Sequence, residues 1–486
     1  MRSIITPLTC IILIAFAASA PADAPPNILY ILCDDLGYGD VQGLNLTHGK
    51  IPTPHIDRLI VEGMTFSDAH SGSSVCTPTR YGILTGRYAW RTRLQRGVLG
   101  GADEDPLIAA DRLTVPALLR KHGYTTAIIG KWHLGFNYAS DVHVPKKPPQ
   151  RSAGVPVGSR IVNGPTTRGF DHFYGFEHAR SMSTVIEDGR VTAEIKPIDM
   201  LPAIADRAVD YITQRGRADD RKPFFLYLAL NSPHTPLVPA AEWQGRSPLG
   251  PYGDFVMQTD HVVGQVLTAL DQANLTDNTL VIFTSDNGCA PYIGVDKLQK
   301  QGHYPSADRR GYKSDIWDGG HRIPFIVRWP GHVDSGSVSD QLICLTDLMA
   351  TCADLLDVDL PASAGEDSIS ILPVLEGTAT QPVRQTVVHH SINGEFALRR
   401  GPWKLVFCPG SGGWTAPRDA AARKQGLPSR QLYQMHDDIA ESVNLQSSQT
   451  ARVKQMTELM ERDIAAGRST PGPAQSNDVK VQFATP

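Results

Sequence analysis

The chain has 486 residues, a formal net charge of −4, 41% hydrophobic residues and 20% charged residues, which is the composition of a soluble globular protein with ample core. It has no sustained basic tract, so we expect no nucleic-acid partner, and any attraction for an anionic substrate must be local. The length favours one large domain and one smaller domain.

The N-terminus has the form of a cleaved secretory signal. An Arg follows the initiating Met, residues 11–17 form an apolar run, and small residues follow at 18–20. The run is too short to span a membrane comfortably, and cleavage by Ala24 would start the mature chain near Pro25. We therefore expect a signal peptide at 1–24 and a secreted or periplasmic protein with no membrane attachment after cleavage.

Three apolar runs, at residues 27–33, 223–230 and 279–284, predict buried parallel strands, and each is followed by polar residues. Helical patterns lie between them, including 54–60, 115–121 and 255–267. Because strands and helices alternate, we predict an α/β protein built on a layered sheet. Ligands of such sheets bind beyond the carboxyl ends of the strands, where these polar residues fall.

Two acidic pairs follow two of the predicted strands. Asp34 and Asp35 follow the first, and Asp286 and Asn287 follow the third. Neighbouring side chains of a regular strand point to opposite faces, so each pair can serve one site only where the strand turns. Either pair alone is more often a turn-forming pair. Together, three carboxylates and one amide oxygen suit a hard divalent cation, and Ca²⁺ tolerates irregular geometry better than Mg²⁺.

A cysteine lies where a short helix is predicted to begin. Thr77 is expected to cap this helix, Pro78 to occupy its first position and Gly86 to end it. Cys76 would then lie among unpaired N–H groups at the positive end of the helix dipole, with Arg80 one turn further on. A lone cysteine is more often a small buried hydrophobe, but this arrangement favours a nucleophile in an anion site.

Three other polar side chains are candidates for the same site. In an extended chain Lys131 and His133 fall on one face and Trp132 on the other, so the polar pair can enter a pocket while the indole packs in the core. His234 stands between two prolines on a stiff loop that suits a general acid. A solvated Lys-x-His pair and a structural histidine are the alternatives.

The later chain predicts a loop and a second domain. Residues 137–167 are rich in Pro, Gly, Lys and Arg and predict a long loop at the rim of the site. After about residue 380, Asn393-Gly394 separates two strand-like runs, which is a strong hairpin signal. A helix is expected from about Ala451 to Ala466. We therefore predict a catalytic domain at 25–380 and a smaller C-terminal α+β antiparallel-sheet domain at 381–486.

The cysteines do not predict a disulfide scaffold. Cys10 falls in the expected signal peptide, and with Cys76 assigned to chemistry an odd number remains: Cys33, Cys289, Cys344, Cys352 and Cys408. Cys344 and Cys352 lie in a predicted helix, roughly 12 Å apart by helical rise, which is too far to pair.

Three sequence motifs resemble those of one enzyme family. Ser-Val-Cys-Thr-Pro-Thr-Arg at 74–80, followed by Leu-Thr-Gly, resembles the first signature of the type I sulfatases, whose cysteine is oxidised to formylglycine (3-oxoalanine) after translation. Residues 123–135 resemble the second signature, and Lys313 matches the lysine that contacts sulfate in this family. Asp318 stands where relatives commonly carry Glu.

The resemblance covers the chain from Asn27 to the C-terminal hairpin, and is nearest to the arylsulfatase A and N-acetylgalactosamine-6-sulfatase group. It implies the alkaline phosphatase superfamily fold, in which helices sandwich a large mixed, mostly parallel sheet. It also implies a maturation enzyme that generates formylglycine, and a cation, Ca²⁺ ahead of Mg²⁺, held by Asp34, Asp35, Cys76 in its modified form, Asp286 and Asn287.

The same resemblance implies a mechanism. Arg80 and Lys131 would hold the hydrated formylglycine, one hydroxyl of which would attack sulfur while His234 protonates the departing alcohol. Lys313, with Lys131, would neutralise the sulfate oxygens. The second hydroxyl would then lose its proton, with His133 assisting, and release free sulfate.

The substrate is expected to be a sulfated carbohydrate or polysaccharide rather than a small aryl sulfate. Aromatic and basic residues that would suit a sulfated sugar at the rim are Trp90, Arg91, Arg93, His178, Arg180 and Trp243. Two alternatives stay open: a phosphonate monoester or phosphodiester hydrolase that uses the same site, and a non-catalytic metal-binding protein. The second requires Cys76 to remain a thiol.

Overall fold

The computed structural model describes residues 25–483 except 102, 143 and 145–154. The expected signal peptide and part of the predicted loop at 137–167 lie outside these residues. Ten strands form the main sheet in the order β11-β2-β10-β9-β1-β8-β4-β5-β6-β7. Their bounds are β1 Asn27–Asp34, β2 Met64–Phe66, β4 Thr125–Lys131, β5 His172–Phe176, β6 Thr184–Glu187, β7 Arg190–Glu194, β8 Phe224–Pro233, β9 Thr279–Ser285, β10 Phe325–Arg328 and β11 Ser337–Ser339.

The centre of this sheet is parallel and antiparallel pairs lie on either side of it, while the edge strand β11 runs parallel to β2. Strands β9, β1, β8, β4 and β5 run parallel to one another, while β10 runs antiparallel to β9, and β5, β6 and β7 form antiparallel pairs. Cys33 of β1 pairs with Ser285 of β9, and Asp34 with Pro233 of β8. This register brings the polar residues that follow the three strands to one edge.

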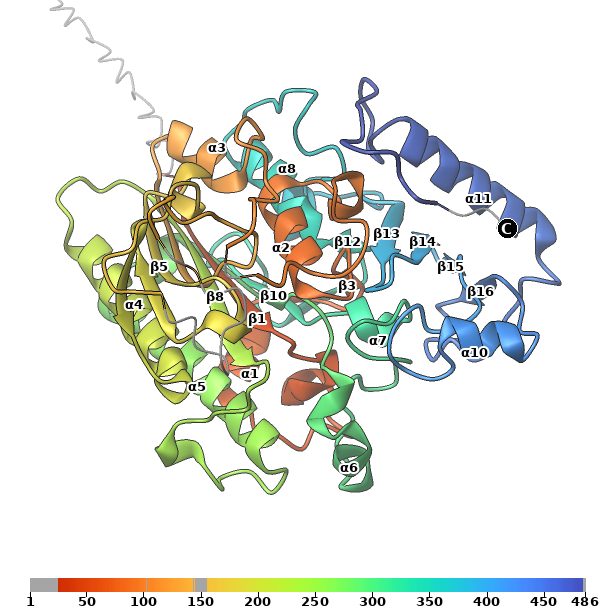
Figure 1. Ribbon diagram of the computed structural model, residues 1–486, viewed down its shortest axis with the longest axis horizontal. Coiled ribbons are helices and arrows are strands. Elements are labelled where there is room, and N and C mark those ends of the chain that lie inside the picture. Colours follow the sequence, from red (N-terminus) through yellow and green to blue (C-terminus); the bar gives the residue numbers. More distant parts are fainter. Residues whose placement is uncertain (1–24, 102, 143, 145–154, 484–486) are drawn as a thin grey trace, which may run out of the picture.

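Helices cover both faces of the main sheet (Figure 1). Helices α1 (Pro54–Glu62), α4 (Pro197–Arg217) and α5 (Pro251–Gln272) pack against the face that carries Leu29 and Ile31. Helices α2 (Cys76–Thr85), α3 (Val115–Lys121) and α8 (Leu348–Leu355) pack against the face that carries Ile28 and Tyr30. Both faces of the central strands are therefore buried, which explains their continuous apolar sequences.

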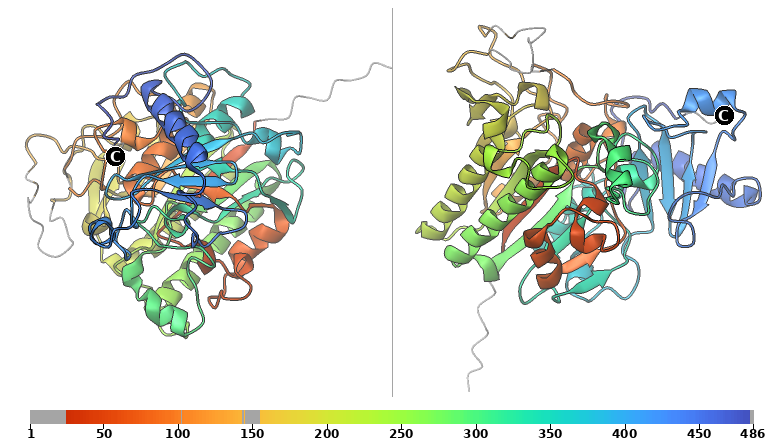
Figure 2. Two further views of the ribbon diagram at one scale, coloured as in Figure 1. Left: turned by 90° about the vertical axis from the view of Figure 1, so that its right-hand side faces the viewer. Right: turned by 90° about the horizontal axis from the view of Figure 1, so that it is seen from below.

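A second, four-stranded sheet lies beside the first near the C-terminus (Figure 2). This C-terminal sheet is fully antiparallel and consists of β13 Thr386–His390, β14 Phe396–Arg400, β15 Trp403–Val406 and β16 Gln431–Gln434. The hairpin predicted at Asn393-Gly394 joins β13 to β14, with Gly394 at a φ of 88°. The closing helix is α11 (Thr450–Ala465). The predicted fold class is confirmed, whereas the domain boundary at residue 381 stays a prediction.

Short elements complete the chain. They are the two-stranded sheet of β3 (Ala69–His70) and β12 (Ile343–Cys344), and the helices α6 Val295–Lys300, α7 Asp318–His321, α9 Leu372–Leu375 and α10 Asp419–Lys424. In the part of the chain that the structure describes, no helix is both long and apolar enough to cross a membrane. The six cysteines described are all free and buried.

Candidate active site

Helix α2 carries the candidate nucleophile at its first residue. Cys76 begins the helix and is buried, with 3% of its surface exposed. The prediction that Thr77 caps this helix is wrong: Val75 occupies the cap position, and the Thr77 hydroxyl accepts a hydrogen bond from the Leu99 N–H instead. The predicted end is confirmed, because Gly86 takes the left-handed conformation that a helix C-terminus favours.

Turns after β1 and β9 place the acidic pairs together. Asp34 ends β1, and Asp35 has a φ of 67°, so the chain turns sharply and both side chains reach one site. The Asp35 N–H donates to Asp286 Oδ1 at 3.2 Å, and the Asn287 side-chain amide donates to Asp35 Oδ1 at 2.8 Å. These four residues are completely or almost completely buried.

Three cations balance the three carboxylates. Lys131 Nζ lies 2.7 Å from Asp34 Oδ2, and Lys313 Nζ lies 2.6 Å from Asp35 Oδ1. Within α2, Arg80 Nε and Nη2 lie 2.9 and 2.8 Å from Asp286 Oδ2. The structure thus brings together the predicted metal ligands and the three predicted basic residues. We refer to these side chains together with Cys76 and Asn287 as the carboxylate cluster.

Burial and charge shift the pKa values of this cluster in different directions. Burial opposes ionisation of Asp34, but Lys131, His234 and Arg80 overcome it and hold the pKa of Asp34 well below its usual value. Burial raises the pKa of Asp286 to about 7, against the charge of Arg80. Burial also raises the pKa of the Cys76 thiol. An unmodified Cys76 would therefore be a protonated, weak nucleophile at neutral pH.

The cluster has the oxygen atoms that a divalent cation needs. Three potential ligand atoms, one each from Asp34, Cys76 and Asp286, lie within 4.8 Å of one another. Asp34 Oδ1 and Asn287 Oδ1 are buried, and neither has a hydrogen-bond partner among the described residues. Because buried polar atoms are normally bonded, these two oxygens fit a hard cation that prefers oxygen ligands.

The two candidate histidines reach the site from the turns that follow β4 and β8. His133 has a φ of 56°, so it reaches the site through a turn after β4 rather than through the extended chain that was predicted. Its Nε2 donates to the Leu99 carbonyl at 2.8 Å, and burial, with Lys131 nearby, lowers its pKa well below the usual value. His234 Nε2 lies 3.6 Å from Asp35 Oδ2. Trp132, which lies between Lys131 and His133 in the sequence, is buried as predicted.

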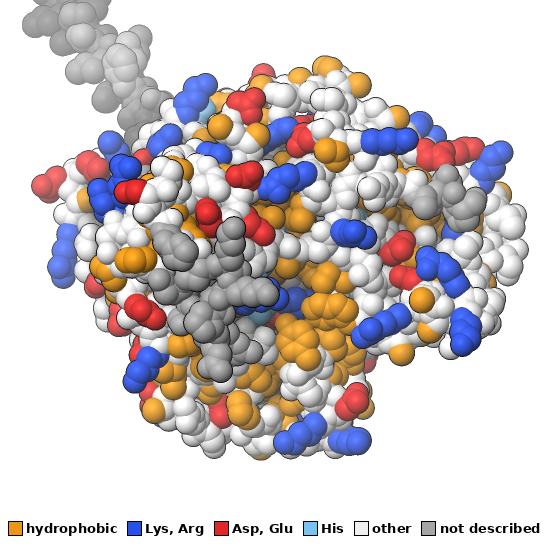
Figure 3. All heavy atoms as spheres, viewed as in Figure 1, with side chains coloured by type: hydrophobic (Ala, Val, Ile, Leu, Met, Phe, Trp, Pro, Cys, Tyr) orange, Lys and Arg blue, Asp and Glu red, His pale blue; other side chains and the backbone are white. Residues whose placement is uncertain are grey.

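A cavity of about 390 Å³ opens above Cys76, His133, His234 and Lys313. Figure 3 shows a hollow in which basic and histidine side chains meet a border of hydrophobic ones. Of the predicted rim residues, His178 and Arg180 line this cavity. Sequence reasoning missed Val98, Thr235, Tyr292, Ile392 and Trp414. They come from separate loops without a shared motif, so no local signal in the sequence could have identified them.

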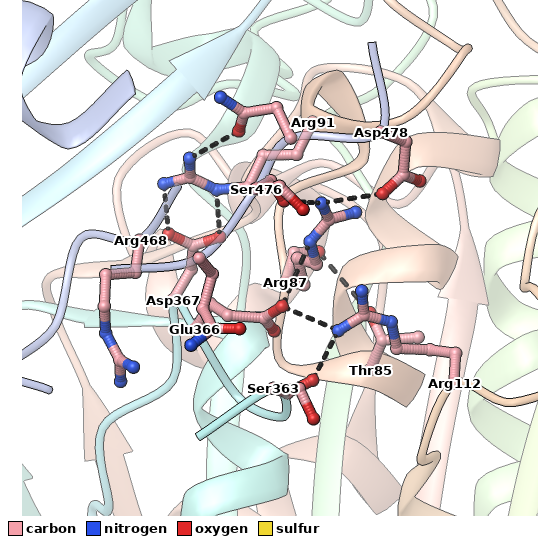
Figure 4. Close-up of polar contacts among 12 residues, drawn as sticks. Thr85, Arg87, Arg91, Arg112, Ser363, Glu366, Asp367, Arg468, Ser476 and Asp478 are labelled. Carbon is pink, nitrogen blue, oxygen red and sulfur yellow. Dashed lines mark hydrogen bonds and ion pairs between the residues drawn. The ribbon is translucent and has the colours of Figure 1, made fainter. Parts of the chain in front are cut away.

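Four predicted rim residues do not line this cavity. Trp90 and Arg91 are 1% and 0% exposed, and Arg91 forms two hydrogen bonds, of 2.8 and 2.7 Å, with the buried Asp367 (Figure 4). Both were wrong predictions, because tertiary packing buries this segment. Arg93 binds the Asp105 carbonyl, and Trp243 packs against His261 and Arg246.

Asp318, the departure from the expected Glu, lies deep between the two sheets. Its Oδ1 lies 2.8 Å from Lys404 Nζ of β15. Burial opposes its ionisation, but Lys404 and nearby histidines hold its pKa well below the usual value. The residue therefore links the main sheet to the C-terminal sheet.

The fold and the cluster define a hydrolase-type site at the carboxyl edge of a mixed α/β sheet. Residues 26–358 match the Sulfatase family, and the chain belongs to that family. An N-acetylgalactosamine-6-O-sulfatase from Bacteroides thetaiotaomicron is 33% identical over 90% of this chain and 92% of its own. Arylsulfatase A from Bos taurus is 32% identical over 90% of this chain and 86% of its own.

A solved structure gives the same result. A Bacteroides thetaiotaomicron protein, described in work on the metabolism of multiple glycosaminoglycans, superposes with a TM-score of 0.78 at 29% identity and covers 90% of this chain and 99% of its own. The predicted family and enzyme class are confirmed: this protein is a sulfatase, which hydrolyses sulfate esters.

Proposed function

We propose that this sulfatase removes O-sulfate from a carbohydrate or polysaccharide, with formylglycine formed from Cys76 by a maturation enzyme and with a bound Ca²⁺. The observation that carries the proposal is the position of Cys76. It lies within 4.8 Å of Asp34 and Asp286, beneath a cavity large enough for a sugar ring. The names of the sulfatase relatives, which include an N-acetylgalactosamine-6-O-sulfatase, support a sugar substrate.

Formylglycine and the cation would supply the nucleophile and the activation of the sulfate ester. A hydrated formylglycine would provide a hydroxyl to attack sulfur, and a cation held by Asp34, Asp35, Asp286 and Asn287 would withdraw charge from the ester. Because Mg²⁺ demands near-ideal octahedral geometry, this irregular set of ligands favours Ca²⁺.

The side chains of the chain itself have separate tasks. Arg80 anchors Asp286 and also donates to the Lys131 carbonyl at 3.0 Å, so it fixes the relative positions of α2 and β4. Lys313 lines the cavity and can neutralise sulfate oxygens there. His234 lies at the same cavity, in position to give a proton to the departing alkoxide. His133 also lines this cavity, and its Nδ1, which has no hydrogen-bond partner among the described residues, can accept a proton when sulfate is released.

Mass spectrometry of the peptide that contains Cys76, after expression with a maturation enzyme, tests the nucleophile. We expect a loss of about 18 Da, as conversion of a thiol to an aldehyde requires, and turnover of a chromogenic aryl sulfate that Cys76→Ala abolishes. An unmodified thiol in protein that still cleaves sulfate would overturn the formylglycine mechanism. Faster cleavage of aryl phosphonate monoesters than of aryl sulfates would favour the phosphonate hydrolase.

A calcium titration tests the metal. At a concentration about 100-fold above the dissociation constant, a ligand that binds only the folded state stabilises it by about 2.7 kcal/mol. We expect Ca²⁺ to raise the melting temperature of the wild type and to leave the melting temperature of Asp286→Asn unchanged. Mg²⁺ should raise the melting temperature of the wild type by less. Equal shifts in both proteins would place the ion elsewhere.

The location of the protein is a separate proposal. We propose that the segment at 1–24 directs secretion or export to the periplasm. Sequencing the N-terminus of the protein recovered from the medium or periplasm should find a start near Pro25, and retention in the cytoplasm would contradict it.

A further inference from the structure

Two unlike pairs of side chains line the active-site cavity. The rings of Tyr292 and Trp414 lie with centroids 5.8 Å apart at an angle of 45°, and 51% of Tyr292 is exposed. His178 and Arg180 also line the cavity and provide polar groups. One aromatic pair and one polar pair therefore share a cavity with Cys76 and Lys313. We call Tyr292 and Trp414 the aromatic wall.

Trp414 belongs to the loop that follows β15, yet it is tied to the segment that carries Lys313. Its backbone N–H lies 3.0 Å from both Ser314 Oγ and Asp315 Oδ1. The Thr415 N–H donates to Asp315 Oδ1 at 3.1 Å, and the Thr415 hydroxyl donates to Asp315 Oδ2. A Cβ on Gly413 would lie only 2.4 Å from the Ser314 carbonyl, so the two loops approach as closely as glycine permits.

These contacts make Trp414 a fixed feature of the site. The anchor for its loop, Asp315, is only two residues from Lys313, the proposed sulfate contact. The loop between β13 and β14 is tied to the same segment, because the Ile392 N–H donates to the Ser314 carbonyl at 3.1 Å. Trp414 is therefore held in a fixed position relative to Lys313, where the sulfate group is expected.

The polar pair has hydrogen-bond donors to spare. His178 Nδ1 accepts the Arg180 N–H at 2.9 Å, which leaves Nε2 to carry the proton of the neutral ring. The His178 ring lies edge to face with His133, with centroids 4.4 Å apart. The Arg180 side chain is exposed.

We propose that the ring bearing the sulfate packs its C–H face on the aromatic wall while Arg180 and His178 donate hydrogen bonds to oxygens on its edge. This inference rests on the proposed function and names the residues that select its substrate. A pyranose combines an apolar C–H face with a rim of hydroxyl oxygens, which matches a cavity lined by both an aromatic and a polar pair. An aryl ring matches the wall but offers the polar pair no ring oxygens.

Steady-state kinetics of the matured enzyme tests this assignment. The substrates are 4-nitrophenyl sulfate and a panel of sulfated monosaccharides that includes N-acetylgalactosamine 6-sulfate, and inorganic sulfate serves as an inhibitor without a ring. Trp414→Ala should raise KM about tenfold for both substrate types. It should leave kcat and the inhibition constant of sulfate within about twofold, because the lost contact is to the ring alone.

Two other variants separate the roles. Arg180→Met should raise KM about tenfold for the sugar and leave KM for 4-nitrophenyl sulfate unchanged, because the aryl ring carries no hydroxyl groups and its nitro oxygens lie at the end opposite the sulfate. Trp403→Ala is the matched control, since Trp403 is a half-buried Trp of the C-terminal sheet that packs under Arg452 and does not line this cavity. If Trp414→Ala does not fold, Trp414→Phe replaces it, and this variant should keep most of the affinity for the substrate ring.

Failure of the inference and failure of the proposed function are distinguishable. A matured wild type that hydrolyses no sulfate ester would contradict the proposed function. An enzyme that hydrolyses 4-nitrophenyl sulfate but none of the sulfated monosaccharides would overturn the assignment of a sugar ring. Equal KM values for Trp414→Ala and Trp403→Ala, or an equal loss of affinity for inorganic sulfate in Trp414→Ala, would overturn the role of the wall.

Discussion

Two buried ion-pair networks lie along α2, and only one of them has the features of an active site. The carboxylate cluster contains Arg80 in the middle of the helix. The second network begins just after the helix, where Arg87 pairs with Asp478 at 3.0 Å and Arg91 pairs with Asp367 at 2.7 Å (Figure 4). All three guanidinium groups are fully buried.

The networks differ in how completely their central carboxylates are bonded and in their access to a cavity. Glu366 Oε2, beside Arg87, also lacks a hydrogen-bond partner among the described residues, but Glu366 does not line the cavity above Cys76. Asp367 accepts hydrogen bonds at both oxygens, from the Arg91 side chain, the Tyr88 N–H and Ser469. Asp34 Oδ1 has no such partner among the described residues, and the cluster lies beneath a cavity. Burial and charge therefore do not distinguish an active site from an ion-pair network that only stabilises the fold. A buried polar atom without a hydrogen-bond partner, next to a cavity, does distinguish the active site.

Removing the proposed nucleophile should give the largest effect on function. Cys76→Ala should reduce kcat/KM by a factor on the order of 10⁴ or more, because the variant can form no formylglycine. The unfolding midpoint in urea should change little, since the helix and the ion pairs remain. Activity assays beside denaturation curves check this. Residual activity within tenfold of the wild type would show that the cluster is not the active site.

Breaking the second network should reduce stability and leave activity almost unchanged, the opposite of the result for Cys76→Ala. Arg91→Ala leaves the buried Asp367 carboxylate without its main partner, which costs about 3–5 kcal/mol of the free energy of unfolding. Activity per folded molecule should stay near that of the wild type. Guanidinium denaturation measures the free energy of unfolding. The specific activity of the folded fraction measures the activity per folded molecule. An active-site phenotype without destabilisation would remove the distinction between the networks.

Glu177 is a buried carboxyl that belongs to neither network. Burial raises its pKa to about 8, and it accepts the Gly135 N–H at 2.9 Å. Because the folded pKa exceeds the unfolded value of 4.5, its stabilising contribution is complete below pH about 4.5 and is lost as pH rises through about 8. Relative to Glu177→Gln, the wild type should therefore lose on the order of 5 kcal/mol across this range.

Denaturation of both proteins at several pH values checks this prediction. The difference between their unfolding free energies should change in one direction as the pH rises. A constant difference would mean that Glu177 has the same pKa in the folded and unfolded states.

The smallest effects should come from predicted rim residues that lie outside the cavity. Arg93→Ala removes a hydrogen bond to the Asp105 carbonyl on the surface and should change stability by less than about 0.5 kcal/mol. Its kcat/KM for any sulfate ester should stay within about twofold of the wild type. A larger loss of activity would place Arg93 at the substrate and restore the original prediction.

Local chemistry made several features predictable. The central strands could be recognised because both faces of a parallel sheet are buried, and Asp34, Asp286 and His234 follow directly after such strands. Asn393-Gly394 marked its hairpin because these residues accept the backbone angles of a tight turn. In contrast, the burial of Trp90 and Arg91 could not be inferred, because an arginine is buried only when a distant carboxylate such as Asp367 reaches it.

By itself the sequence determined the family, the α/β class, the residues of the carboxylate cluster and the C-terminal hairpin, because each depends on short motifs or on a local apolar pattern. Only the tertiary structure decided which residues surround the substrate cavity. Tyr292, Ile392 and Trp414 come from three loops far apart in the chain. Contacts such as those between Asp315 and the loop of Trp414 bring them together, and long-range contacts of this kind leave no periodic signal in the sequence.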